Sequence, residues 1–262
     1  MEFTGRTALI TGASSGLGAE FARRLAERGS DLVVVARRGE LLERQARELS
    51  ERHRVRVTPI ATNLARAGVG TELRDELAAR SITVSTLINN AGFATYNALV
   101  DEDPARIAAE IQLDVATLVD LTRAFLPQMI AGGAGALVNV ASTAAYQPLP
   151  GMAVYGASKA FVLSFTEAVA YETKRTGIRV LALSPGATRT EFFDVVGTEA
   201  AAVGGFQTAE QVVTTALKAL DKRRTPASVI SGRANRISAA FAGLAPRSLA
   251  VATAGRMLSS GA

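Results

Sequence analysis

The chain has 262 residues, of which 48% are hydrophobic and 20% charged, and its formal net charge at pH 7 is +5. This length and composition are typical of a folded domain with a large core, and they exclude a disordered chain. The sequence contains no cysteine, which excludes disulfides, thiolate nucleophiles and thiolate metal ligands and suits a reducing, cytoplasmic location.

Short apolar runs alternate with amphipathic helical patterns along the chain. The apolar runs predict strands at residues 7–11, 31–36, 55–60, 85–89, 136–141, 178–183 and 227–230. The helical patterns cover residues 17–28, 40–52, 70–80, 104–125, 154–176 and the segment from 208, with an irregular stretch at 190–206 and a weakly amphipathic tail from 235. Gly177 is expected to end the fifth helix as its C′ residue. The alternation predicts a single α/β domain, residues 1–262, with a doubly wound parallel sheet and helices on both faces.

Residues 124–158 carry no charged side chain and are long enough to span a bilayer. Proline and glycine interrupt this stretch, at Pro127, Gly132, Gly133, Gly135, Pro148 and Pro150 among other positions. We therefore expect a buried strand with flanking loops and no transmembrane span. Residues 1–5 lack the basic and apolar regions of a signal peptide, so we expect a cytoplasmic protein.

A glycine-rich turn joins the first predicted strand to the first predicted helix. Gly12 can adopt a positive φ, Gly16 allows a phosphate to approach the backbone, and Gly18 lets the helix pack close to the strand. The helix N-terminus then offers free N–H groups and the positive end of its dipole to a pyrophosphate. The turn predicts a dinucleotide site that also includes Ser14, Ser15 and Leu17.

The same turn matches G-x-S-x-G, the nucleophile elbow of α/β-hydrolases. That interpretation needs a histidine downstream of an acid, and the only histidine, His53, lies in a charged run where we expect a solvated helix-end residue. Gly151 and Gly156 have P-loop spacing, but Ala157 replaces the lysine that such a loop requires. Dinucleotide binding is therefore favoured over hydrolysis, and no metal site is predicted.

The residues after the second predicted strand indicate which dinucleotide binds. In dinucleotide-binding domains an acidic residue at this position accepts hydrogen bonds from the adenosine ribose. Here the strand ends at Ala36 and is followed by Arg37 and Arg38, so no carboxylate is placed to repel a 2′-phosphate. Because guanidinium groups bind phosphate well, we expect NADP(H), with Arg37 as the main contact. The alternative is that one or both arginines only face solvent.

Tyr155 and Lys159 lie four residues apart in a predicted helix, so their side chains share one face. A free tyrosine has a pKa of about 10, and an ammonium group ~4 Å away would lower it by roughly three units before desolvation is subtracted. The pair is a candidate acid–base group. Ser142 follows the fifth predicted strand and residues 89–92 follow the fourth, so we expect these groups to meet in one crevice beyond the strand ends.

Taken in this order, the motifs resemble the short-chain dehydrogenase/reductase family over residues 4 to about 232. The matching segments are 11–18 (TGASSGLG), 89–92 (NNAG), Ser142, 155–159 (YGASK) and 184–188 (SPGAT). The resemblance implies a Rossmann-type fold and an NADP(H)-dependent oxidoreductase that transfers a hydride between nicotinamide and a carbonyl or alcohol carbon. It implies that Tyr155 donates or accepts the proton, that Lys159 binds the nicotinamide ribose and lowers the tyrosine pKa, and that Ser142 orients the substrate oxygen.

The resemblance also implies a lid, an oligomer and a set of cofactor contacts. The lid is expected at residues 191–206, whose phenylalanines and valines favour an apolar small-molecule substrate. The long helices at 104–130 and 154–176 resemble the family's subunit interfaces, so we expect a homodimer or homotetramer. The expected cofactor contacts are Gly12, Ser14, Ser15, Gly16, Leu17, Gly18, Arg37, Arg38, Asn63, Leu64, Asn90, Ala91, Gly92, Tyr155, Lys159, Pro185, Gly186, Thr188 and Thr190.

Two positions depart from the family pattern. Asp114 stands where the family usually has the asparagine that anchors a water relay to the lysine, and Asn63 stands where it often has aspartate near the adenine. We expect Asp114 to keep the relay through its main-chain carbonyl while its carboxylate raises the pKa of Lys159. The predicted catalytic set is Ser142, Tyr155, Lys159 and Asp114.

Two other functions stay open on the sequence alone. A redox-sensing protein could bind NADP(H) on the same fold without turnover, although the complete set of Ser142, Tyr155 and Lys159 argues against it. The C-terminal part could bind nucleic acid or a membrane surface, because its basic residues outnumber its acids. Most arginines of the chain are interleaved with glutamate, so we expect no nucleic-acid partner and regard residues 235–262 as a basic extension. The basic residues of the C-terminal part are Lys222, Arg223, Arg224, Arg233, Arg236, Arg247 and Arg256.

Overall fold

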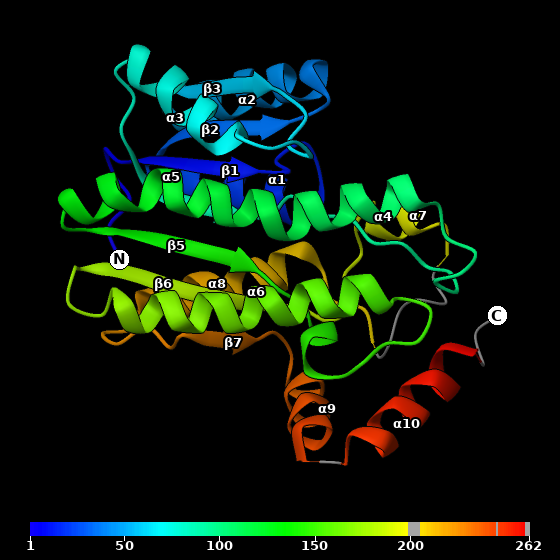
Figure 1. The fold of residues 1–262 in the computed structure, drawn as a ribbon. Coiled ribbons are helices and arrows are strands. Elements are labelled where there is room, and N and C mark those ends of the chain that lie inside the picture. The colour runs from blue at the N-terminus through cyan, green and yellow to red at the C-terminus, as the bar shows by residue number, and fades with distance from the viewer. Residues whose placement is uncertain (199–204, 245, 260–262) are drawn as a thin grey trace.

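A seven-stranded parallel sheet with the order β3-β2-β1-β4-β5-β6-β7 forms the centre of the computed structural model (Figure 1). The structure describes residues 1–198, 205–244 and 246–259. The strands are β1 (Thr7–Thr11), β2 (Asp31–Ala36), β3 (Val57–Ala61), β4 (Val84–Asn89), β5 (Gly135–Val140), β6 (Ile178–Ser184) and β7 (Ser228–Ile230). The strand order reverses between β1 and β4, and such a switch point opens a crevice beyond the carboxyl ends of the strands.

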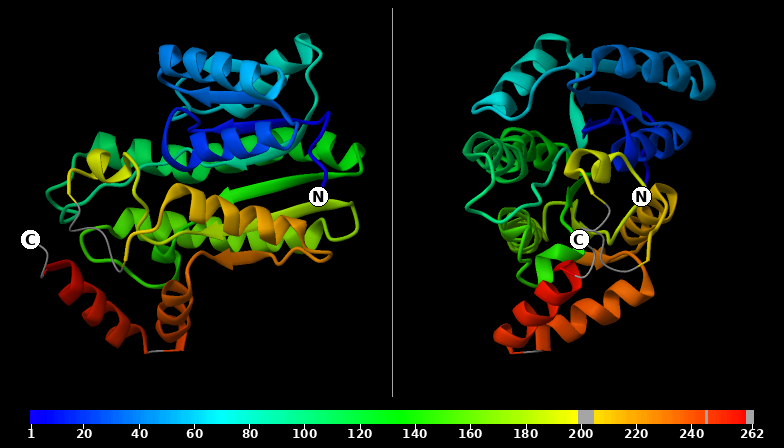
Figure 2. Two further views of the ribbon diagram at one scale, coloured as in Figure 1. Left: turned by 180° about the vertical axis from the view of Figure 1, so that it is seen from behind. Right: turned by 90° about the vertical axis from the view of Figure 1, so that its right-hand side faces the viewer.

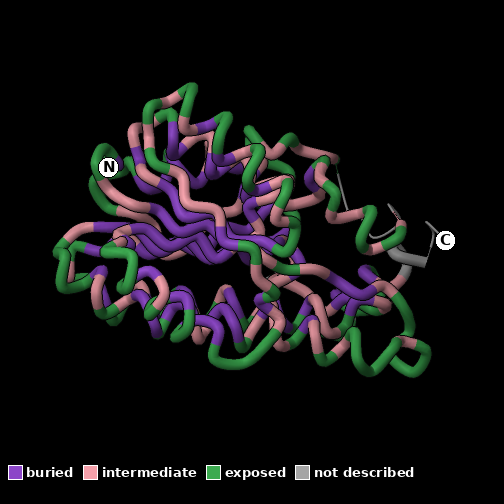
Figure 3. The backbone as a smooth tube through the Cα atoms, turned by 90° about the horizontal axis from the view of Figure 1, so that it is seen from above, coloured by how far each residue is buried: buried purple, intermediate pink, exposed green. Residues whose placement is uncertain are grey.

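Helices cover both faces of the sheet (Figure 2). Side chains of α1 (Gly16–Glu27), α2 (Gly39–His53) and α8 (Ala209–Asp221) pack on one face. Those of α3 (Val69–Ala79), α5 (Leu118–Ala131) and α6 (Ala153–Glu172) pack on the other. The sheet between them is the most deeply buried part of the chain (Figure 3), which explains why its strands are continuous apolar runs. The predicted doubly wound, single-domain fold is confirmed.

The helix predicted at residues 104–125 consists of three pieces. The first, α4 (Pro104–Ile111), begins where the Asp103 carboxylate accepts a hydrogen bond from the Ala105 N–H at 2.9 Å. A π-helical segment, η1 (Gln112–Thr117), then joins α4 to α5. Such segments interrupt regular α-helices and occur often at functional sites. The predicted catalytic residue Asp114 lies in η1 and is buried.

Several predicted boundaries differ from the structure, and two of the differences have a local cause. Strand β3 begins at Val57 rather than at residue 55, because Arg54 ends α2 in the left-handed conformation with φ of 56°. Helix α6 ends at Glu172 rather than at residue 176, and the Thr173 hydroxyl donates a hydrogen bond to the Val169 carbonyl at 2.8 Å. Gly177 is therefore not a C′ residue. It has φ of 81° beside β6, where a Cβ atom would clash with the Gly133 carbonyl oxygen.

The C-terminal part contains more helix than the sequence predicts. Within the described part of the tail from residue 235, the chain forms α9 (Arg233–Leu244) and α10 (Arg247–Ser259), which project from the sheet edge formed by β7 (Figure 1). The irregular stretch expected at 190–206 contains a short helix, α7 (Phe192–Val196), while residues 199–204 lie outside the described part of the chain. Within the described ranges, the structure contains no helix with the length and apolar character that crossing a membrane requires.

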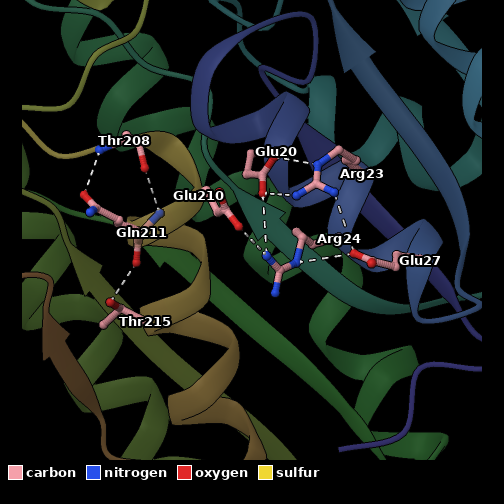
Figure 4. A network of polar contacts seen from close by, with 8 residues as sticks. All are labelled: Glu20, Arg23, Arg24, Glu27, Thr208, Glu210, Gln211 and Thr215. Atoms are coloured by element: carbon pink, nitrogen blue, oxygen red, sulfur yellow. Dashed lines mark hydrogen bonds and ion pairs between the residues drawn. The ribbon is translucent and has the colours of Figure 1, made fainter.

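Charged side chains of α1 and α8 interleave at the surface (Figure 4). Arg24 lies 3.6 Å from Glu27 on its own helix and 3.5 Å from Glu210 on α8. Helix α8 begins with a capping box, in which the side chains of Thr208 and Gln211 each accept a hydrogen bond from the other's backbone N–H. This surface shows the interleaved arginines and glutamates that the sequence predicts for solvated helix faces.

Candidate active site

A cavity of about 650 Å³ opens beyond the carboxyl ends of the central strands. It is lined by the β1–α1 turn, the residues after β2, β4 and β5, the first turns of α6 and the segment after β6. The structure brings all the predicted cofactor contacts to this cavity except Gly18, which lies behind the turn. Of the predicted catalytic residues, Ser142, Tyr155 and Lys159 line the cavity, while Asp114 lies behind its wall.

The β1–α1 turn is shaped by close backbone contacts. Gly12 has φ of 65°, and a Cβ atom there would lie 2.8 Å from Nδ2 of Asn90. A Cβ atom on Gly18 would clash with the Gly12 carbonyl oxygen. Ser15 is the N-cap of α1 and makes no side-chain capping bond, and the first turn of α1 contains no acid. The free N–H groups at this helix end therefore face the cavity as an anion site.

A threonine joins the turn to the end of β4. The Thr11 hydroxyl oxygen accepts hydrogen bonds from the backbone N–H groups of Asn90 and Ala91, both at 3.0 Å. The Asn90 amide in turn donates to the Thr11 carbonyl at 2.9 Å. Behind them, the buried side chains of Asn89 and Asn139 are linked at 2.9 Å, so the ends of β1, β4 and β5 form one hydrogen-bonded block. The sequence analysis did not assign a function to Thr11 or Asn139.

The two arginines after β2 differ in their contacts. Arg37 is exposed at the rim of the cavity. Arg38 donates hydrogen bonds to the Ser14 hydroxyl at 3.1 Å and to the Glu191 carboxylate at 2.7 Å. The hydrogen bond from Arg38 holds the pKa of Glu191 below its usual value, and a second bond from Ser15 acts in the same direction. Glu191 is the first residue of the predicted lid, and this bond places it at the end of the cavity that the β1–α1 turn lines.

Tyr155, Lys159 and Ser142 meet at the inner end of the cavity. The Lys159 ammonium lies 5.5 Å from the centre of the Tyr155 ring and donates a hydrogen bond to the Val140 carbonyl at 3.3 Å. Ser142 follows β5, its side chain hydrogen bonds with Tyr155, and its hydroxyl also accepts a bond from the Ala144 N–H at 3.1 Å. Ser142 is thus both the N-cap of the short 3-10 helix η2 (Thr143–Tyr146) and a neighbour of the phenol.

Burial, rather than the neighbouring lysine, dominates the pKa of Tyr155. Removal from water raises this pKa, while Lys159 and the hydrogen bond with Ser142 lower it. Asp114 and Glu110 raise it further, and the net direction is upward. Lys159 therefore acts in the expected direction but does not prevail in the protein alone, because the effect of burial is larger and the two acids oppose the lysine as well.

Asp114 forms a direct ion pair with Lys159. The carboxylate Oδ2 lies 2.9 Å from the ammonium, both side chains are buried, and Oδ1 accepts a hydrogen bond from the Phe93 N–H at 3.1 Å. A Cβ atom on Gly92 would lie 2.9 Å from Oδ1, so glycine leaves the room that this carboxylate occupies. Burial lowers the pKa of Lys159, but Asp114 and the other acidic groups raise it by more, which is the upward direction expected from the sequence.

Aromatic side chains of the predicted lid lie beside Tyr155 at the inner end of the cavity. The ring centres of Tyr155 and Phe192 are 5.6 Å apart, those of Phe192 and Phe193 are 5.4 Å apart, and those of Phe193 and Phe206 are 5.3 Å apart. Residues of the predicted lid therefore cover the phenol. Other apolar residues that line the cavity include Phe93, Leu113, Leu149, Met152 and Val195.

Two further features of the site were not predicted from the sequence. One face of α9 lines the cavity with Ala234, Asn235, Ser238, Ala239 and Ala242, although this segment was expected to be only a basic extension. The second feature is Glu110, a fully buried acid one helical turn before Asp114. The four-residue spacing of these two acids could have indicated that they share a helix face.

Comparison with known proteins identifies the family. A family model for short chain dehydrogenases matches residues 6–201. Sulfoacetaldehyde reductase 2 of Chromohalobacter salexigens is 41% identical over 195 residues, which are 70% of this chain and 73% of that protein.

Two solved structures extend the likeness to nearly the whole chain. A short-chain dehydrogenase from Sphingobium yanoikuyae in complex with NADPH is 34% identical, with a TM-score of 0.79, over 91% of this chain and 94% of that chain. A short-chain dehydrogenase/reductase from Burkholderia phymatum in complex with NAD is 27% identical, with a TM-score of 0.80, over 92% of this chain and 93% of that chain. This chain belongs to the short-chain dehydrogenase/reductase family and is an oxidoreductase of the type that uses NAD(P)(H).

Proposed function

We propose that this chain transfers a hydride between NADP(H) and the carbonyl or secondary alcohol carbon of an apolar small molecule, with Tyr155 as the general acid or base. The observation that carries the proposal is the meeting of Tyr155, Lys159 and Ser142 at the inner end of a cavity whose outer end has an anion-binding helix terminus. This arrangement supports proton transfer and phosphate binding in one space.

The residues of the outer end fit a dinucleotide. Gly12 and Gly18 allow the close backbone contacts that shape the β1–α1 turn, and the N-terminus of α1 presents free N–H groups for the pyrophosphate. Ala36 ends β2 without a carboxylate, and Arg37 and Arg38 stand where a 2′-phosphate would need positive charge. The NADPH held by the Sphingobium yanoikuyae relative is in keeping with this choice. The NAD held by the Burkholderia phymatum relative shows that family membership alone does not decide it.

At the inner end, each side chain has a distinct task. The bound dinucleotide supplies or accepts the hydride. Ser142 would hold the substrate oxygen by a hydrogen bond, and Tyr155 would give its proton to that oxygen during reduction or remove one during oxidation. Lys159 would bind the nicotinamide ribose and hold positive charge near the phenol. Asp114 keeps that ammonium in place through the 2.9 Å ion pair.

The cavity favours an apolar substrate over a sulfonate. Among the residues that the structure describes, the charged lining residues are Arg37, Arg38, Lys159 and Glu191, and of these three cations only Lys159 is at the inner end, where Asp114 already pairs with it. A sulfonate buried there would lack a cationic partner of its own, which is costly. The aromatic side chains beside Tyr155 instead offer contact to a hydrophobic ketone. We therefore propose an apolar carbonyl substrate, although a relative of this chain is named a sulfoacetaldehyde reductase.

A cofactor and substrate comparison tests this proposal. Thermal shifts with NADP+ and NAD+ should show tighter binding of NADP+. NADPH oxidation should then be measured with ketones and aldehydes of increasing apolar size and with sulfoacetaldehyde. We expect the highest kcat/KM with an apolar ketone. Preference for NAD+ would contradict the role given to the arginines, preference for sulfoacetaldehyde would contradict the substrate class, and cofactor binding without any turnover would contradict the whole proposal.

A further inference from the structure

Glu110 is a fully buried acid in the last turn of α4, with an exposed fraction of 0%. Its Oε2 atom accepts two hydrogen bonds from Thr95, one from the backbone N–H at 3.0 Å and one from the hydroxyl at 2.8 Å. Its Oε1 atom is buried and has no hydrogen-bond partner within the described part of the chain. A buried carboxylate with an unpaired oxygen is costly, so this environment favours the protonated acid.

The acid lies behind the Lys159–Asp114 ion pair. Glu110 and Asp114 are four residues apart across the junction of α4 and η1, and α4 packs against α6, which carries Lys159 and Tyr155. The ionisable groups that act on Glu110 are Asp114 from η1 and Lys159 from α6, while Thr95 from the loop after β4 supplies uncharged donors. Asp114 pairs with the ammonium directly, Glu110 acts on both through its charge, and Glu110 acts in turn on Tyr155.

We propose that Glu110 is a positioning residue for the reaction proposed above: by holding or losing a proton it changes the charge behind Lys159, and it thereby sets the protonation of Tyr155. This inference depends on the proposed function only where it predicts an effect of Glu110 on turnover. With Glu110 protonated, Asp114 and Lys159 balance each other. With Glu110 ionised, the group of three carries one net negative charge, which disfavours the phenolate.

The direction of the effect follows from this charge. Burial raises the pKa of Glu110 to about 7, with Thr95 lowering it and Asp114 raising it, so Glu110 changes its charge in the neutral range. An ionised Glu110 keeps Tyr155 in the phenol form, which donates the proton in carbonyl reduction. A neutral Glu110 eases formation of the phenolate, which alcohol oxidation needs. Glu110 therefore extends the range of reduction towards high pH.

The test compares the protein with Glu110→Gln, which keeps the size of the side chain and an oxygen that accepts both Thr95 hydrogen bonds. Near-ultraviolet absorbance follows the ionisation of Tyr155 without turnover. The signal of Tyr155 is the difference between each protein, with or without Glu110→Gln, and the same protein carrying Tyr155→Phe in addition. We expect the midpoint of Tyr155 to fall by about one pKa unit, the effect of a unit charge roughly 10 Å away at an effective dielectric constant near 20. Glu172→Gln makes the same charge change at the exposed end of α6 and should leave the midpoint unchanged.

One further measurement, the pH profile of turnover, separates this inference from the proposed function. In Glu110→Gln, the rate of NADPH-dependent reduction should begin to fall at a lower pH. The basic limb of its pH profile should shift by the same number of pH units as the absorbance midpoint. If no carbonyl compound is reduced, the proposed function fails, but the absorbance titration still tests the coupling. If turnover occurs and neither the midpoint nor the basic limb moves, only the inference about Glu110 fails.

Infrared spectroscopy covers the case in which Glu110→Gln does not fold. The carboxyl band of Glu110 should disappear as the pH rises through about 7. Thr95→Val removes the hydroxyl that stabilises the carboxylate and should move this transition to higher pH. A Glu110 carboxyl that remains ionised down to pH ~5, close to the range of ordinary glutamates, would overturn the inference.

Discussion

Two ion pairs stand at the two ends of the cavity, and they differ in burial. Arg38 and Glu191 meet at 2.7 Å at the outer end, with side chains that are 46% and 51% exposed. Lys159 and Asp114 meet at 2.9 Å behind the inner end, with side chains that are 7% and 0% exposed. An exposed pair contributes about 0–1 kcal/mol and can exchange partners, whereas removing one member of a buried pair costs about 3–5 kcal/mol. The chain thus carries an exchangeable charge where we propose that a phosphate binds and a fixed charge where we propose that a proton moves.

The largest effect is expected from Lys159→Met, which leaves the Asp114 carboxylate buried and unpaired. We expect a loss of about 3–5 kcal/mol in the free energy of unfolding at neutral pH and a fall in kcat of roughly 10²–10⁴-fold, the range of general acid–base catalysis. Denaturant unfolding and NADPH oxidation measure the two effects. Adding Asp114→Asn should restore part of the stability but not the activity. Equal stability of Lys159→Met and of the exposed-site control Lys174→Met would show that the pair is not buried in solution.

The next effect concerns the pH dependence of stability. The pKa of Glu110 is about 7 in the folded protein against an ordinary value of 4.5, so the folded state binds the proton more tightly than the unfolded state. Stability therefore falls as pH rises from about 4.5 to 7, by about 3 kcal/mol in total, and is constant above that range as far as this group is concerned. Glu110→Gln should lack this fall. Unfolding curves at pH 5 and 8 test the difference, and parallel pH dependence in both proteins would contradict it.

A smaller effect is expected at the outer end. The double variant Arg37→Ala/Arg38→Ala removes the two cations proposed to hold the 2′-phosphate, and hydrogen bonds to charged groups contribute about 1.5–3 kcal/mol. We expect affinity for NADP+ to fall by roughly 10–100-fold while affinity for NAD+ changes little. Calorimetric binding of both dinucleotides measures this selectivity, with Arg52→Ala, at the far end of α2, as a control. An equal loss for both dinucleotides would mean that the arginines do not read the 2′-phosphate.

The smallest effect is expected from Glu191→Gln, because its ion pair with Arg38 is exposed. The free energy of unfolding should change by less than about 1 kcal/mol. Affinity for NADP+ should rise a few-fold, since Arg38 no longer divides its charge between Glu191 and the phosphate. A loss of stability as large as that of Lys159→Met would remove the contrast between the two ends of the cavity.

The same contrast explains how much the sequence could predict. The sheet and the β1–α1 turn were predictable because each depends on local signals: buried apolar runs of strand length, and glycines where Gly12 and Gly18 leave no room for a Cβ atom. Ser142 and residues 89–92 could be placed together because parallel strands end at one edge of the sheet. These inferences require no knowledge of distant partners.

The parts that could not be predicted depend on contacts between distant segments. Arg38 meets Glu191 across 153 positions, and nothing near either residue in the sequence indicates the other. The inner face of α9 consists of small residues whose pattern does not distinguish a cavity wall from a surface. The upward pKa of Tyr155 depends on burial and on two acids from α4 and η1, so an estimate from the Tyr155–Lys159 spacing alone could not include them.

The central claim is that the Tyr155 hydroxyl moves the proton, and a pair of conservative variants tests it most directly. Tyr155→Phe removes that hydroxyl, while Tyr171→Phe removes one from an exposed tyrosine on the same helix. Both should bind NADP+ nearly as well as the parent chain. Carbonyl-dependent NADPH oxidation should fall by at least ~10²-fold in the first variant and stay at the parent level in the second. Retained oxidation in Tyr155→Phe would contradict the account.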